Sequence, residues 1–421
     1  MKKLLTTALV MCTMTSVALP PAPNEHVSDK KVFINATIHV GNGEVLTDAQ
    51  FAISDGKIIQ SGHSKAMYTG NEIDLKGMHI YPGMILTNTN LGLTEIDSFK
   101  ATQDANETGQ INPNVRSLVA YNTDSERIPT MRFNGILLAQ TTPSGGLVSG
   151  SSSVVQLDAW NWEDAAVKAD DGIHVNWPAK WAKKFDFATF TMQLKKDDKY
   201  SSKVQKIKSL FEDAKVDQST TNLKLNAIKP IINGERSLYI HSNNPKSIIE
   251  SIQYFKSIGI NKLVLVSGQA AGQVIDFIKQ AQVPVIVEAT HSLPQLSDDS
   301  VDAAYRLPVL LQNAGILTAL SYPGSMSSRN LAFSAGSTVA YGNNTETALQ
   351  LITSNPAKIL GIDNQYGSLE VGKSATFIIT EGDALDMRGN VIKEAYIDGR
   401  AIELNTRQQE LYQRYKDKYN Q

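Results

Sequence analysis

The stretch that organises this chain is residues 80–90, Ile-Tyr-Pro-Gly-Met-Ile-Leu-Thr-Asn-Thr-Asn. Its Pro-Gly pair predicts a turn, because proline presets one backbone angle and glycine tolerates positive φ. The apolar run after the turn predicts a short buried strand that ends in small polar side chains. Such a strand is typical of the start of a βα barrel, in which the strand ends carry the functional site.

The bulk composition describes a globular protein of ordinary polarity. The chain has 421 residues, of which 42% are hydrophobic and 19% charged. This length favours one large α/β domain plus a smaller one. The net charge is −2, and no stretch is densely basic, so the composition argues against a nucleic-acid partner.

The amino-terminal residues have the pattern of an export signal. Lys2 and Lys3 precede an apolar run, and small residues at 16 and 18 offer a cleavage site, which predicts a signal peptide over residues 1–18. We therefore expect an exported protein located in the periplasm, with no membrane span once the signal is removed. Cys12, the only cysteine, lies within this signal after Met11, which makes a lipoprotein anchor the less favoured alternative. The mature chain would then contain no disulfide and no thiolate ligand.

Short strands at both ends of the mature chain predict a small β-sandwich domain. Residues 31–80 contain alternating apolar segments with turn signals, and similar segments return over residues 361–404. Residues 81–360 would form the barrel, inserted between these two halves. Residues 405–421 predict a charged carboxy-terminal helix.

Strand-length apolar runs alternate with amphipathic helical segments across the predicted barrel, which is typical of parallel βα units. Beyond the opening strand, six runs are recognisable, at residues 135–140, 153–157, 238–241, 263–266, 283–287 and 316–320, and 187–192 is the candidate eighth. The predicted fold class is therefore α/β, a TIM-like (β/α)8 barrel inserted in a small β-sandwich made from both chain ends.

Three motifs resemble those of the amidohydrolase superfamily, in its imidazolonepropionase-like group. They are residues 77–85 (GMHIYPGMI), 353–361 (TSNPAKILG) and 367–375 (GSLEVGKSA), in the order and at the spacing of that family. The resemblance implies a metal-dependent hydrolase of non-peptide C–N bonds, in which divalent metal ions convert water to a nucleophile.

The metal-ligand positions implied by this resemblance are mostly substituted. The first strand of the family ends in a His-x-His pair, where this chain has Asn88 and Asn90. Of the usual ligands only His241 is retained, at the end of the fifth strand. Amide oxygens are poor zinc ligands, so a tight zinc site is not expected and no cofactor is assigned. A single divalent ion remains the alternative.

The pocket candidates lie at or near a predicted strand end, except Arg116, which lies in the polar, irregular segment over residues 94–134 that follows the first barrel strand. Asn88 and Asn90 can both donate to and accept from a polar ligand. Arg116 has the fork geometry that suits a carboxylate, although a surface salt bridge is the competing interpretation. The remaining candidates are His241, Ser267, Gln269, His291 and Ser321.

Two functional hypotheses follow, and no catalytic residue can be assigned. In the first, the site is degenerate, and the protein binds a small polar ligand or supports a partner, such as a catalytic homologue in a hetero-oligomer. In the second, the protein is a hydrolase of cyclic amides or dipeptide-like substrates with a rearranged site. That site would recruit His241, His291 and carboxylates such as Glu288, Asp298 or Asp299.

Overall fold

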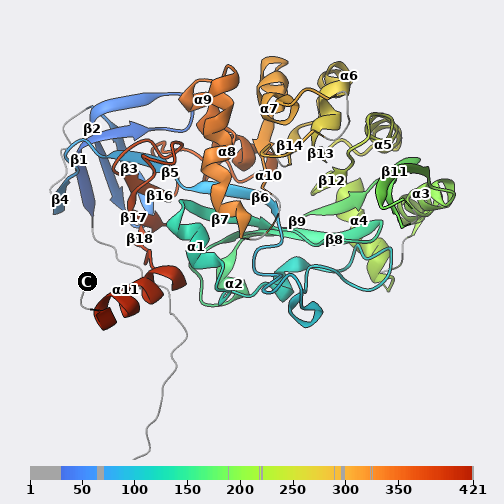
Figure 1. The fold of residues 1–421 in the computed structure, drawn as a ribbon, viewed down its shortest axis with the longest axis horizontal. Coiled ribbons are helices and arrows are strands. Elements are labelled where there is room, and N and C mark those ends of the chain that lie inside the picture. Colours follow the sequence, from blue (N-terminus) through green and yellow to red (C-terminus); the bar gives the residue numbers. More distant parts are fainter. Residues whose placement is uncertain are drawn as a thin grey trace, which may run out of the picture.

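The computed structural model describes residues 30–63, 71–187, 189–217, 219, 221–288, 290–294, 299–322, 324 and 326–419. The predicted signal peptide with its Cys12 lies outside these residues, and so does Asp298. The described chain is a mixed α/β structure built on two large sheets (Figure 1). None of the described helices has the length and hydropathy needed to cross a bilayer.

One sheet is assembled from both ends of the chain, in the order β18-β17-β16-β5-β1-β2-β3, with β4 also paired to β1. Its amino-terminal strands are β1 (Lys31–His39), β2 (Val45–Ser54), β3 (Lys57–Gly62), β4 (Asn71–Asp74) and β5 (His79–Pro82). Its carboxy-terminal strands are β16 (Phe377–Thr380), β17 (Ile392–Ile397) and β18 (Arg400–Ala401). The two ends join where β5 pairs with β16, and Phe33, Phe51 and Phe377 form an aromatic core on this sheet.

The second sheet is a nearly closed eight-stranded barrel. Its strands are β6 (Met84–Thr89), β7 (Ile136–Thr141), β8 (Val148–Gln156), β9 (Ala166–Asn176), β12 (Ser237–His241), β13 (Leu263–Ser267), β14 (Val285–Val287) and β15 (Thr318–Leu320). A bridge between Thr87 and Ser321 brings the end of β15 back to β6. The predicted fold class is thereby confirmed. One strand departs from the regular pattern, because β8 runs antiparallel to both β7 and β9.

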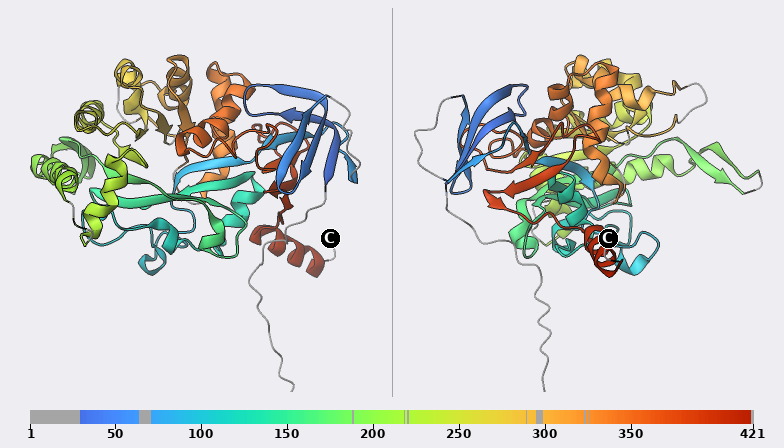
Figure 2. Two further views of the ribbon diagram at one scale, coloured as in Figure 1. Left: turned by 180° about the vertical axis from the view of Figure 1, so that it is seen from behind. Right: turned by 60° about the vertical axis from the view of Figure 1, so that its left-hand side comes forward.

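The predicted eighth strand at residues 187–192 was wrong. Residue 187 and residues 189–190 lie in the turn of a hairpin, formed by β10 (Trp181–Asp186) and β11 (Thr191–Lys196), which projects from the body of the molecule (Figure 2). The missing barrel strand is β9. Its polar first half, including Asp170 and Asp171, hides the strand pattern because it is charged where barrel strands are usually apolar.

Helices pack around the barrel, and α5 shows how the sequence specifies them. The Asn244 side chain caps its start by accepting from the Ser247 N–H at 3.2 Å, and Pro245 occupies the first turn. Ile248, Ile252 and Phe255 lie on one face and are fully buried.

The α-helices are α1 (Ile128–Phe133), α2 (Trp162–Ala165), α3 (Tyr200–Val216), α4 (Leu223–Ile232), α5 (Pro245–Ser257), α6 (Ile275–Ala281), α7 (Ala303–Asn313), α8 (Leu331–Ser337), α9 (Thr345–Gln350), α10 (Ser354–Leu360) and α11 (Arg407–Tyr419). The 3₁₀ helices are η1 (Lys100–Thr102), η2 (Ser117–Ala120), η3 (Gln269–Val274), η4 (Ser327–Asn330) and η5 (Thr338–Tyr341).

Candidate functional site

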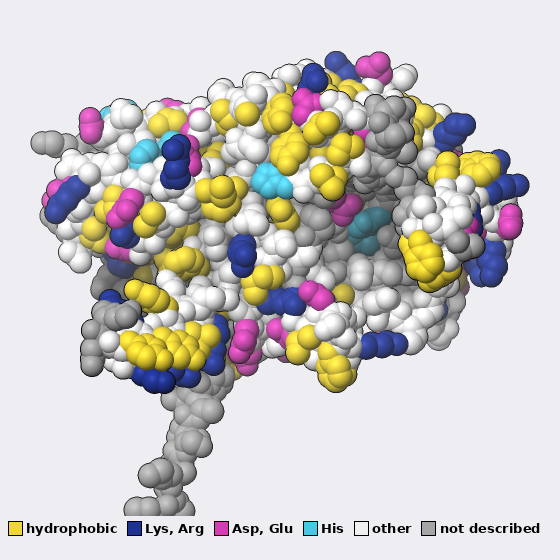
Figure 3. Space-filling view, in the orientation of Figure 1, with side chains coloured by type: hydrophobic (Ala, Val, Ile, Leu, Met, Phe, Trp, Pro, Cys, Tyr) yellow, Lys and Arg dark blue, Asp and Glu magenta, His cyan; other side chains and the backbone are white. Residues whose placement is uncertain are grey.

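A pocket of about 220 Å³ opens at the carboxyl ends of the parallel barrel strands. Its walls come from the last residues of β6, β9 and β12 and from the segments that follow β6, β7, β14 and β15. The lining residues are Asn88, Thr89, Asn90, Thr142, Pro143, Ser144, Asn176, His241, Glu288 and Gly324. Figure 3 shows a hollow on this face with histidine and acidic side chains inside it. Because barrel enzymes carry their sites at this end of the strands, we take this strand-end pocket as the candidate site.

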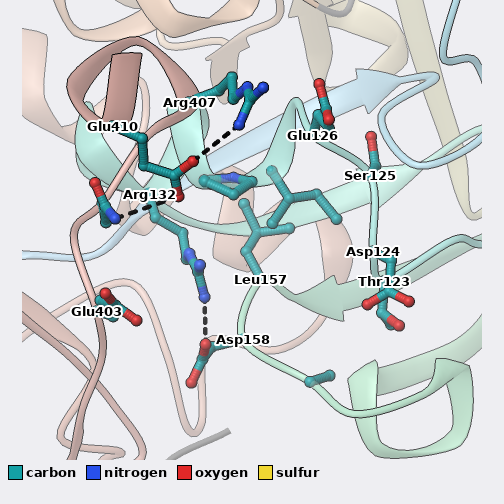
Figure 4. Close-up of a pocket in the computed structure, with 14 residues that line it drawn as sticks. Thr123, Asp124, Ser125, Glu126, Arg132, Leu157, Asp158, Glu403, Arg407 and Glu410 are labelled. Atoms are coloured by element: carbon teal, nitrogen blue, oxygen red, sulfur yellow. Dashed lines mark hydrogen bonds and ion pairs between the residues drawn. The ribbon is translucent and has the colours of Figure 1, made fainter. Parts of the chain in front are cut away.

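A second cavity, of about 250 Å³, lies at the opposite end of the barrel (Figure 4). Its walls come from the start of α1, the segment after β8 and the chain around α11. Two ion pairs lie in its walls, Arg132 with Asp158 and Arg407 with Glu410. Asp158 is also bound by Arg400 at 3.0 Å. This cavity therefore lies between the barrel and the carboxy-terminal segment, which contact each other there.

Asn88 is oriented by an irregular backbone at the end of β6. Its φ is +48°, and the ladder between β6 and β7 shifts register between Leu86 and Thr89. Its N–H donates to Gln140 Oε1 at 3.0 Å, and its side-chain Nδ2 donates to Glu288 Oε1 at 2.7 Å. Burial raises the pKa of the Glu288 carboxyl, and the bond from Asn88 opposes that rise only in part.

Two histidines share a hydrogen bond at the floor of the pocket. His241 Nε2 lies 2.7 Å from His174 Nδ1, and His174 Nε2 lies 2.8 Å from Ser152 Oγ. The His174 ring also stacks on Tyr239 with 4.5 Å between ring centroids. Burial lowers the pKa of His241 to about 4 and lowers the pKa of His174 well below its usual value. Both rings are therefore neutral at neutral pH.

A buried carboxyl group, Asp171 on β9, ends this network. Ser152 Oγ donates to Oδ1 at 2.6 Å, while Tyr239 Oη and Gln140 Nε2 donate to Oδ2 at 2.6 and 3.0 Å. Burial raises the pKa of Asp171, and the three donors act against that rise. Gln140 connects the two halves of the site, because its amide oxygen accepts from Asn88 and its amide nitrogen donates to Asp171.

The residues at the strand ends do not fit the metal centre that the resemblance implies. Within the residues that the structure describes, no three His, Cys, Asp or Glu side chains are grouped so that they could hold an ion. The Asn88 amide nitrogen is directed at Glu288, and His241 Nε2 is directed at His174. Apart from amide oxygens, which are poor zinc ligands, His241 Nδ1 and one oxygen of Glu288 are left, and these two atoms are too few to hold zinc.

Of the predicted site residues, Asn88, Asn90 and His241 come together in the pocket. The other five lie outside its lining. Ser321 Oγ donates to the Thr87 carbonyl at 2.9 Å where the barrel closes. Arg116 binds Asp170 at 2.8 Å, which is the surface salt bridge considered as its competing interpretation.

The remaining three candidates contact other parts of the chain. Ser267 is buried at the end of β13. Gln269 Nε2 donates to the Leu293 carbonyl at 3.2 Å. His291 Nε2 lies 3.2 Å from Ser337 Oγ, and burial lowers the pKa of His291.

Replacing His241 by Gln is expected to remove part of the acid sensitivity of folding. The unfolded histidine binds a proton near its ordinary pKa of 6.5, whereas the folded one resists protonation down to about 4. The free energy of unfolding of the wild-type protein therefore falls by about 3 kcal/mol through His241 as the pH falls from 6.5 to 4. Thermal unfolding midpoints measured across this range should fall less steeply in His241→Gln than in the wild type. His63→Gln, at an exposed histidine, is the control and should retain the wild-type slope.

Comparisons with known proteins agree with this architecture. Residues 296–402 match the model of the Amidohydrolase family. No curated protein sequence matches the chain. The chain is similar in structure to an amidohydrolase from Thermotoga maritima MSB8, with a TM-score of 0.76 and 21% identity over 89% of this chain and 99% of that one.

Two further solved structures have the same fold at lower similarity. One is a Xaa-Pro dipeptidase with methionine bound in its active site, with a TM-score of 0.57 and 13% identity over 89% of this chain and 100% of that one. The other is a zinc-bound adenosine deaminase from Xanthomonas campestris, with a TM-score of 0.51 and 13% identity over 94% of this chain and 98% of that one. The resemblance to the amidohydrolase superfamily is thus confirmed, while the imidazolonepropionase-like group stays a prediction.

Proposed function

We propose that this protein binds a small polar ligand in the strand-end pocket and does so without a metal centre. The observation that carries the proposal is the 2.7 Å bond from Asn88 Nδ2 to Glu288 Oε1. An amide donor stands where the resemblance implies a metal ligand, and it is directed at the carboxylate that could otherwise bind an ion. The side chains of this pocket therefore suit recognition of a ligand by hydrogen bonds.

The pocket offers a ligand mainly hydrogen-bond acceptors. The Asn176 side-chain amide donates to the carbonyl oxygens of Gly145 and Gly146. The Asn90 side-chain amide donates to Thr94 Oγ1 at 3.3 Å. Their amide oxygens are left for the pocket, together with the second oxygen of Glu288. A ligand rich in N–H or O–H groups would satisfy these oxygens, and a primary amine would also pair with the carboxylate.

Metal analysis tests the first half of the proposal. The protein is expressed in medium supplemented with zinc and manganese, dialysed, and measured by plasma mass spectrometry. We expect well under one ion per chain, on the order of a tenth or less, because one imidazole nitrogen and one carboxylate oxygen, even with amide oxygens beside them, hold an ion weakly. About one tightly bound ion per chain would overturn the metal-free assignment.

A binding screen tests the second half. Small amines and matched carboxylates are compared by thermal shift and then by calorimetry, on the wild type and on Glu288→Gln. Amines should bind, and Glu288→Gln should weaken them about tenfold or more, since a hydrogen bond to a charged group contributes about 1.5–3 kcal/mol. Glu403→Gln, in the cavity at the opposite end of the barrel, is the matched control. Equal binding of carboxylates, or no effect of Glu288→Gln, would contradict the proposal.

A rearranged hydrolase is the second candidate function. The neutral His241 ring and the carboxyl of Glu288 line the same pocket, a combination able to accept and return a proton. Turnover of a cyclic amide or dipeptide that survives chelation and is abolished in His241→Ala would favour this candidate. A partner role in the periplasm, as a hetero-oligomer with a catalytic homologue, would be supported by co-purification of that homologue.

A further inference from the structure

An uninterrupted line of hydrogen bonds connects the pocket to a buried carboxyl group. It runs from His241 to His174 at 2.7 Å, from His174 to Ser152 at 2.8 Å and from Ser152 to Asp171 at 2.6 Å. We propose that a proton taken up at His241 Nδ1 is passed along this line and ends on the Asp171 carboxylate. The inference rests on the proposed function, because it takes the strand-end pocket as the ligand site.

The direction of each bond follows from an ionised Asp171. Ser152 then donates its hydroxyl hydrogen to Oδ1, so its oxygen accepts from His174 Nε2–H. His174 Nδ1 carries no hydrogen and accepts from His241 Nε2–H. A neutral imidazole has one N–H, so His241 Nδ1 is bare. Among the described residues none is bonded to this nitrogen, which leaves it to a ligand in the pocket.

Proton uptake reverses every bond in the line without moving a heavy atom. An N–H bond forms at His241 Nδ1 as the ligand's own bond to hydrogen breaks. The Nε2–H of His241 passes its proton to His174 Nδ1, and the Nε2–H of His174 passes its proton to Ser152 Oγ. Ser152 releases its original hydroxyl hydrogen to Asp171 Oδ1. One proton has entered, the carboxylate has become a carboxylic acid, and both rings remain neutral.

The orientation of Gln140 selects the oxygen that receives the proton. Its Oε1 is held by the N–H of Asn88, so its Nε2 donates to Asp171 Oδ2 beside the hydroxyl of Tyr239. Oδ2 therefore keeps two donors, and Oδ1 faces Ser152 alone.

The surroundings favour the arrangement in which every group is neutral. Burial raises the pKa of Asp171 and lowers the pKa of both histidines, so an imidazolium is the costly form here. Lys168 is the cation near Asp171, and its Nζ is bonded to the carbonyl of Leu360. At the pocket end, Glu288 is the acidic group that lines the site with His241.

Nitrogen-15 NMR of histidine-labelled, ligand-free protein tests the proposal directly. As the pH falls, His241 should change from a bare Nδ1 with Nε2–H to Nδ1–H with a bare Nε2, so the ring exchanges tautomers. If both nitrogens of His241 become protonated together, the proposal is overturned. Because no ligand is present, failure here is distinguishable from failure of the binding proposal.

Asp171→Asn supplies the sharpest variant. Its amide oxygen can accept from Tyr239 and Gln140 only if its NH₂ donates to Ser152, which fixes the reversed order of bonds. His241 Nδ1 should then carry the hydrogen at every pH from 5 to 8. In Ser152→Ala the line is broken, so the tautomer of His241 should no longer follow Asp171. An Asp171→Asn protein that folds with a bare Nδ1 would overturn the proposal, and if it does not fold, the wild-type titration still decides.

Discussion

An aspartate in place of Asn88 is expected to make folding strongly dependent on pH. The Asn88 side chain lies 2.7 Å from Glu288 Oε1, so Asn88→Asp would bring two carboxyl groups together in a mostly buried position. Such a pair keeps one shared proton to a raised pKa, because two adjacent buried negative charges repel. The folded protein then binds more protons than the unfolded chain, so stability falls as the pH rises above about 4.

The expected size of this effect is about 3 kcal/mol of lost stability at pH 8 relative to the wild type, with a much smaller loss at pH 5. Thermal unfolding midpoints at the two pH values measure it. Asn90→Asp is the matched control, because Asn90 donates to a threonine hydroxyl and not to a carboxylate. Parallel pH profiles for the Asn88→Asp and wild-type proteins would show that the Asn88–Glu288 contact is absent in solution.

Alanine in place of Gly172 is expected to destabilise the barrel by about 3 kcal/mol through overpacking. A Cβ at this position would lie 2.4 Å from the Ser237 carbonyl oxygen and 2.5 Å from the Tyr239 ring. Gly172 and Ser237 are paired in the ladder between β9 and β12, so the carbonyl cannot easily move. The Tyr239 ring would be displaced instead, together with its bond to Asp171.

Calorimetric unfolding of Gly172→Ala and Gly62→Ala checks this expectation. Gly62 ends β3, and a Cβ there would meet no atom of the described residues within 4 Å, so Gly62→Ala should change stability by no more than about 0.5 kcal/mol. The Gly172→Ala protein should also lose the ring stacking between Tyr239 and His174, which shifts the His174 resonances. Equal unfolding midpoints for the two variants would contradict the tight approach of β9 and β12.

The parts of the fold that the sequence predicts are those whose apolar pattern matches a regular element. The strand after residues 82–83 and helix α5 have clear periodicity and turn or capping residues, and both occur in the structure. β9 was not predicted because it combines Asp171 and His174 with apolar neighbours. Asp171 and His174 are buried, and each is bonded to Ser152 on β8, so the burial of these polar side chains depends on residues of another strand.

The sequence predicted where in the fold the candidate site lies, but not the buried side chains that its hydrogen bonds involve. Asn88, Asn90 and His241 stand at strand ends, so the sequence places them near one another. Gln140, Ser152 and Tyr239 lie inside buried strands, where a polar residue is usually only a satisfied part of the core. A useful signal was present in Gln140, because it interrupts an otherwise apolar strand, whereas Ser152 lies in a run of three serines and does not stand out.

The reversed strand β8 has a consequence for the order in which this barrel assembles. Because β8 is antiparallel to both neighbours, β7, β8 and β9 form a meander connected by residues 142–147 and by residues 157–165, which include the short helix α2. Closing these short connections costs less chain entropy than bringing together parallel strands that are separated by a long helical segment. Folding of the barrel can therefore nucleate in this meander, before β6 meets β15. Ser152, His174 and Asp171 would then be brought together at the first stage of folding, and His241 would join them when β12 docks.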